Sequence, residues 1–285
     1  MDKIGKLSTI TFELFGQVIT LNSTMILMTY IVIAFLAISA YLATRKLKQI
    51  PSTGQNMFEI IYEFIEEITL GTLGNKDGKS FVPFIFTIFV FVLAANWIGI
   101  LPHITNFFGF IIAIIHQLFT GEAGQWVVDG ITKTTFIPSQ NTFYYFLFKF
   151  PEFQEPTRSI NTDLALGILV FIIVHVNSIK KHGLLEYFRS YMGDIVPSKG
   201  WWILLFPINP FFYLNVISEV SSVVSHSFRL FGNIFGGFMI LVIVSSLVKH
   251  FLIPVGLLAF FGIFAGIVQA FVFTMLAVTY IGQKN

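Results

Sequence analysis

The chain has 285 residues, of which 55% are hydrophobic and only 11% are charged, whereas a soluble globular domain carries about 25% charged residues. This composition indicates an integral membrane protein in contact with lipid. The net charge of +2 gives no electrostatic footprint for binding nucleic acid. The chain has no cysteine, which excludes disulfides and thiolate metal sites, and we expect neither a bound metal nor a cofactor.

Apolar stretches of roughly 20 residues, the length needed to cross the hydrocarbon core, predict about five transmembrane helices. In chain order the apolar stretches are 23–44, 81–101, 161–179 and 201–282. The last stretch predicts a hairpin of two long tilted helices, Ser218 to Val248 and Phe251 to Gly282, because each exceeds the length of a perpendicular crossing. We therefore expect an all-α, polytopic helical membrane protein with a single membrane domain over 1–285.

Residues 54–74, between the first two spans, are amphipathic. Their apolar side chains recur at helical spacing, at Met57, Ile60, Ile61, Phe64 and Ile65. Glutamates occupy the other side, at Glu59, Glu63, Glu66 and Glu67. This pattern predicts a helix that lies on the membrane surface or against a partner.

Basic clusters set the expected orientation in the membrane. Lys and Arg gather at 45–48 and at 180–189, after the first and third spans, and such loops stay in the cytoplasm. The N-terminus is then outside, the C-terminus is cytoplasmic, and residues 103–158 form an outer loop. Within that loop the apolar run 107–119 is too short to span comfortably, which predicts an interfacial or re-entrant segment.

A stripe of polar side chains runs along the last apolar tract. Steps of three and four residues, which stay on one face of a helix, visit only polar residues: Asn215, Glu219, Ser222, His226, Arg229 and Asn233. Gly232 and Gly236 add a smooth surface near the same side that suits close helix approach. We interpret the polar stripe as an ion pathway through the membrane.

Arg229 is the most informative residue of this stripe, because a charge at the bilayer centre costs about 2.5–17 kcal/mol. The nearest carboxylate along the stripe, Glu219, is ten residues away, or about 15 Å along a helix. Arg229 therefore meets water or a carboxylate of another chain, unless it is a structural arginine that snorkels toward a helix end. His226 suits a satisfied core histidine as well as an ion pathway, whereas an unpaired Glu219 is costly and indicates function.

The last span presents a second face. Gly262, Gly266 and Gln269 lie at spacings of four and three residues. The sequence GIFAG is a small-xxx-small pattern, which predicts helix packing first of all. Gln269 is the polar residue on this face, and it either hydrogen-bonds toward the Arg229 stripe or forms an ordinary interhelical bond.

The motif SFRLFGNIFGG around Arg229 resembles the signature of ATP synthase subunit a, the stator half of a rotary ion channel. Other stretches resemble the family in the same order: GQNMFE at 54–59, FVPFIFTIFVFVLAANWIGILP at 81–102, PTRSINTDLALG at 156–167 and QAFVFTMLAVTYIG at 269–282. The resemblance covers the chain from about Pro51 to its end.

This resemblance implies a function. It implies that Arg229 is the essential stator arginine and faces a carboxylate on each subunit of a rotating c-ring. It also implies two aqueous half-channels, so that an ion rides the ring for nearly a full turn between them. Peripheral-stalk b subunits and membrane lipid are the other implied partners, in a bacterial plasma (inner) membrane. The sequence has no phosphate-cradling loop, so the chain supplies the transport half of the enzyme and does not hydrolyse ATP alone.

The chain departs from the family at the outer half-channel. Many members carry an acid nine positions after the arginine and a histidine seven before the last-span glutamine, where this chain has Phe238 and Gly262. The usual acid before the third span is Ser159 here. Asn161 and Asp163 are the remaining candidates for the outer entrance, or they only cap the helix. The oxygens that remain are mostly hydroxyl and amide, which favours Na⁺ over H⁺ as the coupling ion.

Two other functions are less well supported by the sequence. A self-contained ion channel or transporter would need its own acidic ion site at mid-membrane and an internal repeat, and neither is visible. A membrane scaffold would leave the polar stripe unexplained.

Overall fold

The structure, a computed structural model, describes residues 9–14, 17–45, 47–100, 104–120, 125–129, 133–137, 154–191, 209–248, 256–257 and 259–284. Parts of the predicted outer loop 103–158 lie outside this description, namely residues 103, 121–124, 130–132 and 138–153. So do residues 192–208 and 249–255, which lie before and within the predicted hairpin.

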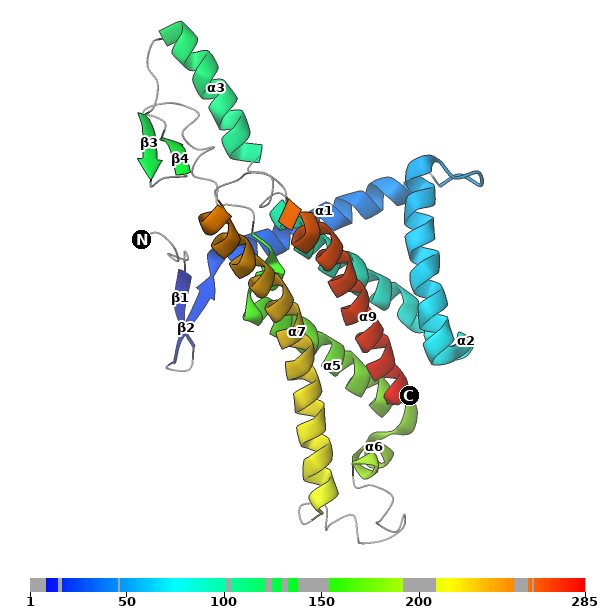
Figure 1. The fold of residues 1–285 in the computed structure, drawn as a ribbon. Coiled ribbons are helices and arrows are strands. Elements are labelled where there is room, and N and C mark those ends of the chain that lie inside the picture. Colours follow the sequence, from blue (N-terminus) through cyan, green and yellow to red (C-terminus); the bar gives the residue numbers. More distant parts are fainter. Residues whose placement is uncertain are drawn as a thin grey trace.

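Long helices dominate the fold (Figure 1). They are α1 (Ser23–Thr44), α2 (Thr53–Trp97), α5 (Ile160–His182), α7 (Pro210–Val248) and α9 (Ala265–Gln283). The last continues directly from the π-helical η4 (Ala259–Phe264). Among the described residues five helical segments are long and apolar enough to cross a membrane. The predicted all-α, polytopic helical membrane fold is therefore confirmed.

The predicted amphipathic segment and the second span are two arms of one element, α2. Gly74 separates the arms with φ 77° and ψ 161°, a left-handed backbone that glycine adopts without steric cost, and Figure 1 shows the sharp bend. Beyond the bend Asp77 forms an ion pair with Lys181 near the end of α5, with Oδ2 and Nζ 2.5 Å apart. The bend lets the second arm return into the helical bundle.

Short elements accompany the long helices. They are the hairpin β1 (Thr9–Leu14) and β2 (Gln17–Asn22), η1 (Ile98–Ile100), α3 (Ile104–Thr120), the hairpin β3 (Gln125–Asp129) and β4 (Lys133–Ile137), η2 (Pro156–Arg158) and α6 (Leu184–Ser190). Both hairpins are antiparallel and neither was expected from the sequence. In Figure 1 α3 and the second hairpin stand apart from the long helices.

The helices of the predicted C-terminal hairpin differ from their expected bounds. The first, α7, begins at Pro210 rather than Ser218 and has 39 residues, or about 58 Å at 1.5 Å per residue. Proline suits the first turn of a helix, and the Asn209 side chain accepts a hydrogen bond from the Phe211 amide at 2.9 Å. The second helix is described only from Ala259 onward apart from residues 256–257.

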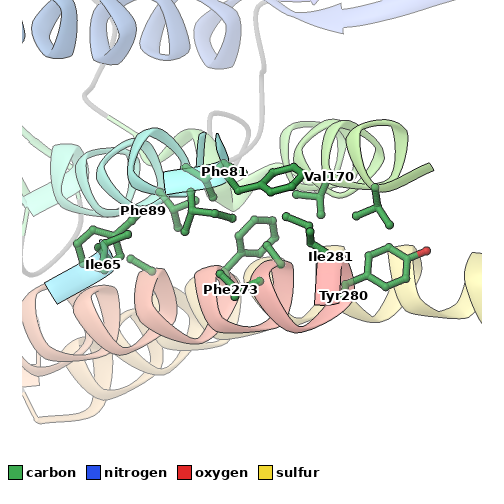
Figure 2. Packing of buried hydrophobic residues seen from close by; sticks show 14 of the residues in the cluster. Ile65, Phe81, Phe89, Val170, Phe273, Tyr280 and Ile281 are labelled. Carbon is green, nitrogen blue, oxygen red and sulfur yellow. The ribbon is translucent and has the colours of Figure 1, made fainter. Parts of the chain in front are cut away.

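One apolar core joins α2, α5, α7 and α9. Its buried side chains include Ile65 and Phe89 of α2, Val170 of α5, Leu230 of α7 and Phe273 of α9. Figure 2 shows Ile65, Phe89, Val170 and Phe273 pointing toward one another. Lipid tails are as apolar as these side chains, so close packing rather than escape from water holds the helices together. A smaller cluster attaches α1 to the end of α2.

The amphipathic arm of α2 exposes part of its apolar side. Met57, Ile60 and Phe64 are exposed. The acidic side of the arm, including Glu59, Glu63 and Glu66, instead lines an apolar cavity of about 1110 Å³ between α1, α2 and α5.

Candidate ion pathway

The predicted polar stripe lies along the edge of the packed face of α7. Ser227 and Leu230 on that face are completely buried. Beside them the stripe passes from buried to exposed: Glu219 is buried, Asn215, Ser222, His226 and Asn233 are half-buried, and Arg229 is exposed. The stripe therefore lies at the boundary between the packed and the exposed sides of α7.

Arg229 has no partner within the described part of the chain. No described carboxylate lies within ion-pair distance of its guanidinium, and the neighbouring Phe228 is 54% exposed. Next to it, a Cβ added at Gly232 or Gly236 would meet nothing within 4 Å. Arg229 is thus presented on an open, smooth part of the α7 surface.

The glycines of the last span have a different environment. A Cβ at Gly262 would come within 2.6 Å of the Ile100 side chain, and one at Gly266 within 3.2 Å of the Trp97 ring. In addition, the Asn96 amide donates a hydrogen bond to the Gly266 carbonyl oxygen at 3.1 Å. These two glycines allow α9 to approach α2 within the chain, whereas Gly232 and Gly236 leave their surface free.

His226 and Gln269 each place a buried side-chain nitrogen in the region between α7 and α9. His226 Nδ1 lies 2.8 Å from the Ser222 carbonyl oxygen, and its ring stands edge-on to Phe273 of α9. His226 Nε2 and Gln269 Nε2 are both buried and have no hydrogen-bond partner among the described groups. Buried polar atoms of this kind are where ordered water or a passing ion is bound.

Glu219 has polar partners in the structure, whereas the sequence indicated an unpaired carboxylate. Tyr280 of α9 donates a hydrogen bond to Glu219 Oε2, and Lys284 Nζ lies 2.5 Å from Oε1. His175 of α5 places Nε2 3.7 Å from Oε2. In Figure 2 the Tyr280 hydroxyl points away from the apolar cluster. Two helices, α5 and α9, thus contribute polar side chains around one buried carboxylate of α7.

A chain of hydrogen bonds leads from this carboxylate toward α6. Tyr187 Oη is 2.8 Å from His175 Nδ1 and 3.0 Å from Tyr191 Oη. The Asn215 amide donates to the Tyr191 carbonyl oxygen at 2.9 Å. Burial raises the pKa of both tyrosine hydroxyls above the usual 10.0, so they stay protonated and can donate. No local sequence pattern indicates His175, Tyr187, Tyr191, Tyr280 and Lys284, since only folding brings them to Glu219.

The candidates for the outer entrance lie at the beginning of α5. Asp163 is completely buried, and neither of its carboxylate oxygens has a described hydrogen-bond partner. Ser227 Oγ donates to the Asp163 carbonyl oxygen at 3.1 Å, which ties this turn to α7 close to Arg229. Asn161 is exposed. It lies inside the helix and Ser159 is the N-cap, so the interpretation of Asn161 as the cap is wrong.

Comparison with known proteins gives a consistent picture. The family model described as "ATP synthase A chain" matches residues 24–282. The chain is 31% identical over 260 residues to ATP synthase subunit a of Trichlorobacter lovleyi, covering 91% of this chain and 86% of the relative. It is 32% identical over 253 residues to the subunits a of Geotalea daltonii and Geobacter sulfurreducens, covering 89% of this chain and 83% of each relative. With its polytopic helical fold, the chain belongs to the ATP synthase A chain family.

Proposed function

We propose that this chain is the ion-translocating stator subunit of an ATP synthase membrane sector, with Arg229 facing the ion-binding carboxylates of a c-ring. The observation that carries the proposal is the exposed Arg229 on the open glycine surface of α7, without a described carboxylate in reach. A guanidinium in an apolar helix needs a counter-charge, and a carboxylate on a partner that moves past α7 supplies one.

The physical chemistry of arginine suits this role. Its guanidinium stays charged at every physiological pH. A cation near a carboxylate favours the ionised form and lowers its affinity for a bound proton or metal ion. Each ring carboxylate therefore releases its ion as it comes opposite Arg229. The fixed charge also keeps ions from passing directly between the two half-channels.

We assign one half-channel to each side of Arg229. Toward the N-terminus of α7 the inner half-channel follows Ser222 and His226 to Glu219 and Asn215. Toward the other side the outer half-channel uses Asn233, Gln269, Asn161 and Asp163. Burial of Glu219, Gln269 and Asp163 supports the assignment, because buried polar groups in a membrane helix are costly and are kept for ion movement.

Further partners and the orientation are part of the same proposal. The peripheral-stalk b subunits and membrane lipid cover the remaining apolar surface, where many large hydrophobic side chains are exposed. The N-terminus is outside and the C-terminus cytoplasmic in a bacterial plasma membrane. The basic residues at the end of α5 support this orientation.

The proposed coupling ion is Na⁺, with H⁺ as the alternative. The hydroxyl and amide oxygens of the sequence pattern favour Na⁺. The titratable chain from Glu219 through His175 to Tyr187 favours H⁺ instead, because protons move between titratable side chains. ATP hydrolysis by the purified complex at alkaline pH, with and without sodium, separates the two. Sodium activation together with sodium protection of the ring carboxylate from carbodiimide indicates Na⁺, and indifference in both assays indicates H⁺.

The role of Arg229 is tested in the assembled complex. We expect Arg229→Ala to abolish ion-driven ATP synthesis, while the ATPase activity of the detached catalytic sector stays normal. Arg229→Lys should also be strongly impaired, because lysine lacks the planar, weakly hydrated fork. The matched control is Arg189→Ala, which removes an arginine that pairs with Glu186 on α6. Normal synthesis in Arg229→Ala membranes would refute the proposed function.

A further inference from the structure

A small cavity lies beside α7 just beyond Arg229. It has a volume of about 50 Å³ and is lined by Asn96, Glu155, Asn233, Gly237, Phe238 and Gly262, among others. A water needs roughly 10–15 Å³ of such volume and polar partners around it, so the cavity is large enough for water. Glu155 is the ionisable side chain among the described residues that line it.

Close packing holds the Glu155 carboxyl group in this position. A Cβ added at Gly99 would overlap the Glu155 carboxyl group, so the carboxyl group lies directly against the backbone at η1. The next residues, Pro156 and Thr157, are buried. Thr157 Oγ1 donates to Asn96 Oδ1 at 2.7 Å, which fixes the segment to α2. Glu155 is therefore built into the structure and is not a loose surface side chain.

The surroundings of Glu155 suit a group that gains and loses a proton. Its side chain is 22% exposed, and Arg158 Nη1 lies 4.0 Å from Oε2. Burial raises the pKa of Glu155, while a backbone hydrogen bond and the charge of Arg158 oppose the increase. The Arg158 guanidinium itself lies 4.3 Å from the centre of the Phe238 ring. A carboxyl group whose pKa moves toward neutral transfers protons more effectively at physiological pH.

The cavity has a defined place relative to Arg229. Asn233, one of its lining residues, follows Arg229 by four residues on the same side of α7, or about 6 Å along the axis. Glu219 lies ten residues away in the other direction, or about 15 Å. The half-buried Glu155 and the buried Glu219 thus occur at different levels along α7, with Arg229 between them.

From this arrangement we propose that Glu155 is the proton-relay carboxylate of the outer half-channel, exchanging protons between outside water and the c-ring through the cavity at Asn233. This inference rests on the proposed function and names H⁺ as the ion that this site carries. Outside water protonates the Glu155 carboxylate. The proton then leaves Glu155 through cavity water for an ionised ring carboxylate, which restores the Glu155 carboxylate. Reversal of these steps releases protons to the outside during ATP hydrolysis.

The test uses the complete complex in liposomes without sodium, with ATP-driven proton pumping followed by a pH-sensitive dye. We expect Glu155→Gln to lower the pumping rate at least about tenfold, since a positioned acid or base contributes typically 10²–10⁴-fold to proton transfer. Glu155→Asp should retain part of the rate. The matched control is Glu13→Gln, which removes an exposed glutamate of β1. Gel analysis of the purified complexes checks that each variant assembles.

A pH profile distinguishes a relay from a structural role. Arg158 faces Glu155 and opposes the rise in its pKa. Arg158→Gln should therefore shift the midpoint of the dependence of pumping on outside pH to higher pH. Unchanged pumping in Glu155→Gln, or an unshifted midpoint in Arg158→Gln, would overturn the inference. So would a native complex that pumps sodium and no protons.

The Glu155 and Arg229 variants test the proton relay and the stator role separately. If Glu155→Gln pumps normally while Arg229→Ala does not pump, the relay is wrong and the stator role stands. If Arg229→Ala pumps normally, the stator role itself fails.

Discussion

At the scale of single residues, the ion pair between Glu219 and Lys284 closes one end of the bundle. Both side chains are largely buried, with 10% and 23% exposed, and Lys284 Nζ also lies 4.4 Å from the centre of the Tyr191 ring. Removing one partner of a buried pair leaves an uncompensated charge, which is strongly destabilising. The pair therefore attaches the end of the chain to α7.

We predict that Lys284→Met destabilises subunit a and that the double variant Glu219→Gln with Lys284→Met recovers part of the loss. Residues in direct contact have interaction energies of about 0.5–3 kcal/mol. The measurement is the temperature at which subunit a leaves the purified complex, for the native protein, both single variants and the double variant. Additive shifts in the cycle would show that the two residues do not interact.

Asp163 has two interpretations that an experiment can separate, a residue of the outer half-channel and an acid that only stabilises the N-terminus of α5. It is completely buried in the first turns of α5, and its carboxylate oxygens have no described partner. If it belongs to the outer half-channel, Asp163→Lys should slow ion uptake from outside more than it reduces the amount of assembled complex. Ion uptake per assembled complex is the measurement. An unchanged rate would leave Asp163 with only the favourable position of an acid near a helix N-terminus.

At the scale of elements, local patterns predicted more than long-range contacts. The stripe on α7 was predictable because helical periodicity alone brings Asn215 through Asn233 to one side. The partners of Glu219 were not, since His175 and Lys284 come from other helices and no local period links them. Glu155 precedes Pro156 and has the sequence character of a loop residue. Gly74, where the predicted amphipathic helix ends, has a left-handed backbone that separates the two helical arms of α2.

The glycines of α7 and α9 provide a prediction at this scale. Gly266 lies against Asn96 and Trp97, whereas a Cβ at Gly232 meets nothing within the chain. Gly266→Leu should therefore separate α9 from α2 and reduce the level of folded subunit a. Gly232→Leu should fold normally and instead hinder assembly with the c-ring or its rotation. Membrane levels of subunit a and ring content of the purified complex report the two effects. Equal losses of folded subunit in both variants would argue against an open ring-facing surface on α7.

At the scale of the whole molecule, the orientation in the membrane decides which half-channel opens to the cytoplasm and which opens to the outside. The five helical segments that are long and apolar enough to cross a membrane place the two ends of the chain on opposite sides if each crosses once. Lys180, Lys181 and His182 end α5, and Lys181 is paired with Asp77 on the same side. Because basic residues stay in the cytoplasm, the proposed orientation makes this end of the bundle, with Glu219 and Lys284, the cytoplasmic one.

The absence of cysteine from the sequence makes this orientation directly measurable. Glu13→Cys and Gln283→Cys each introduce a single thiol at an exposed position, so no other thiol of this chain reacts. We predict that a membrane-impermeant maleimide labels Glu13→Cys in intact spheroplasts and Gln283→Cys only in inverted membranes. Glu186→Cys, at an exposed position on α6, should behave like Gln283→Cys and serves as an internal control. Labelling with the opposite pattern would exchange the two half-channels. The Glu219 cluster would then face the outside, and Glu155 would deliver protons from the cytoplasm.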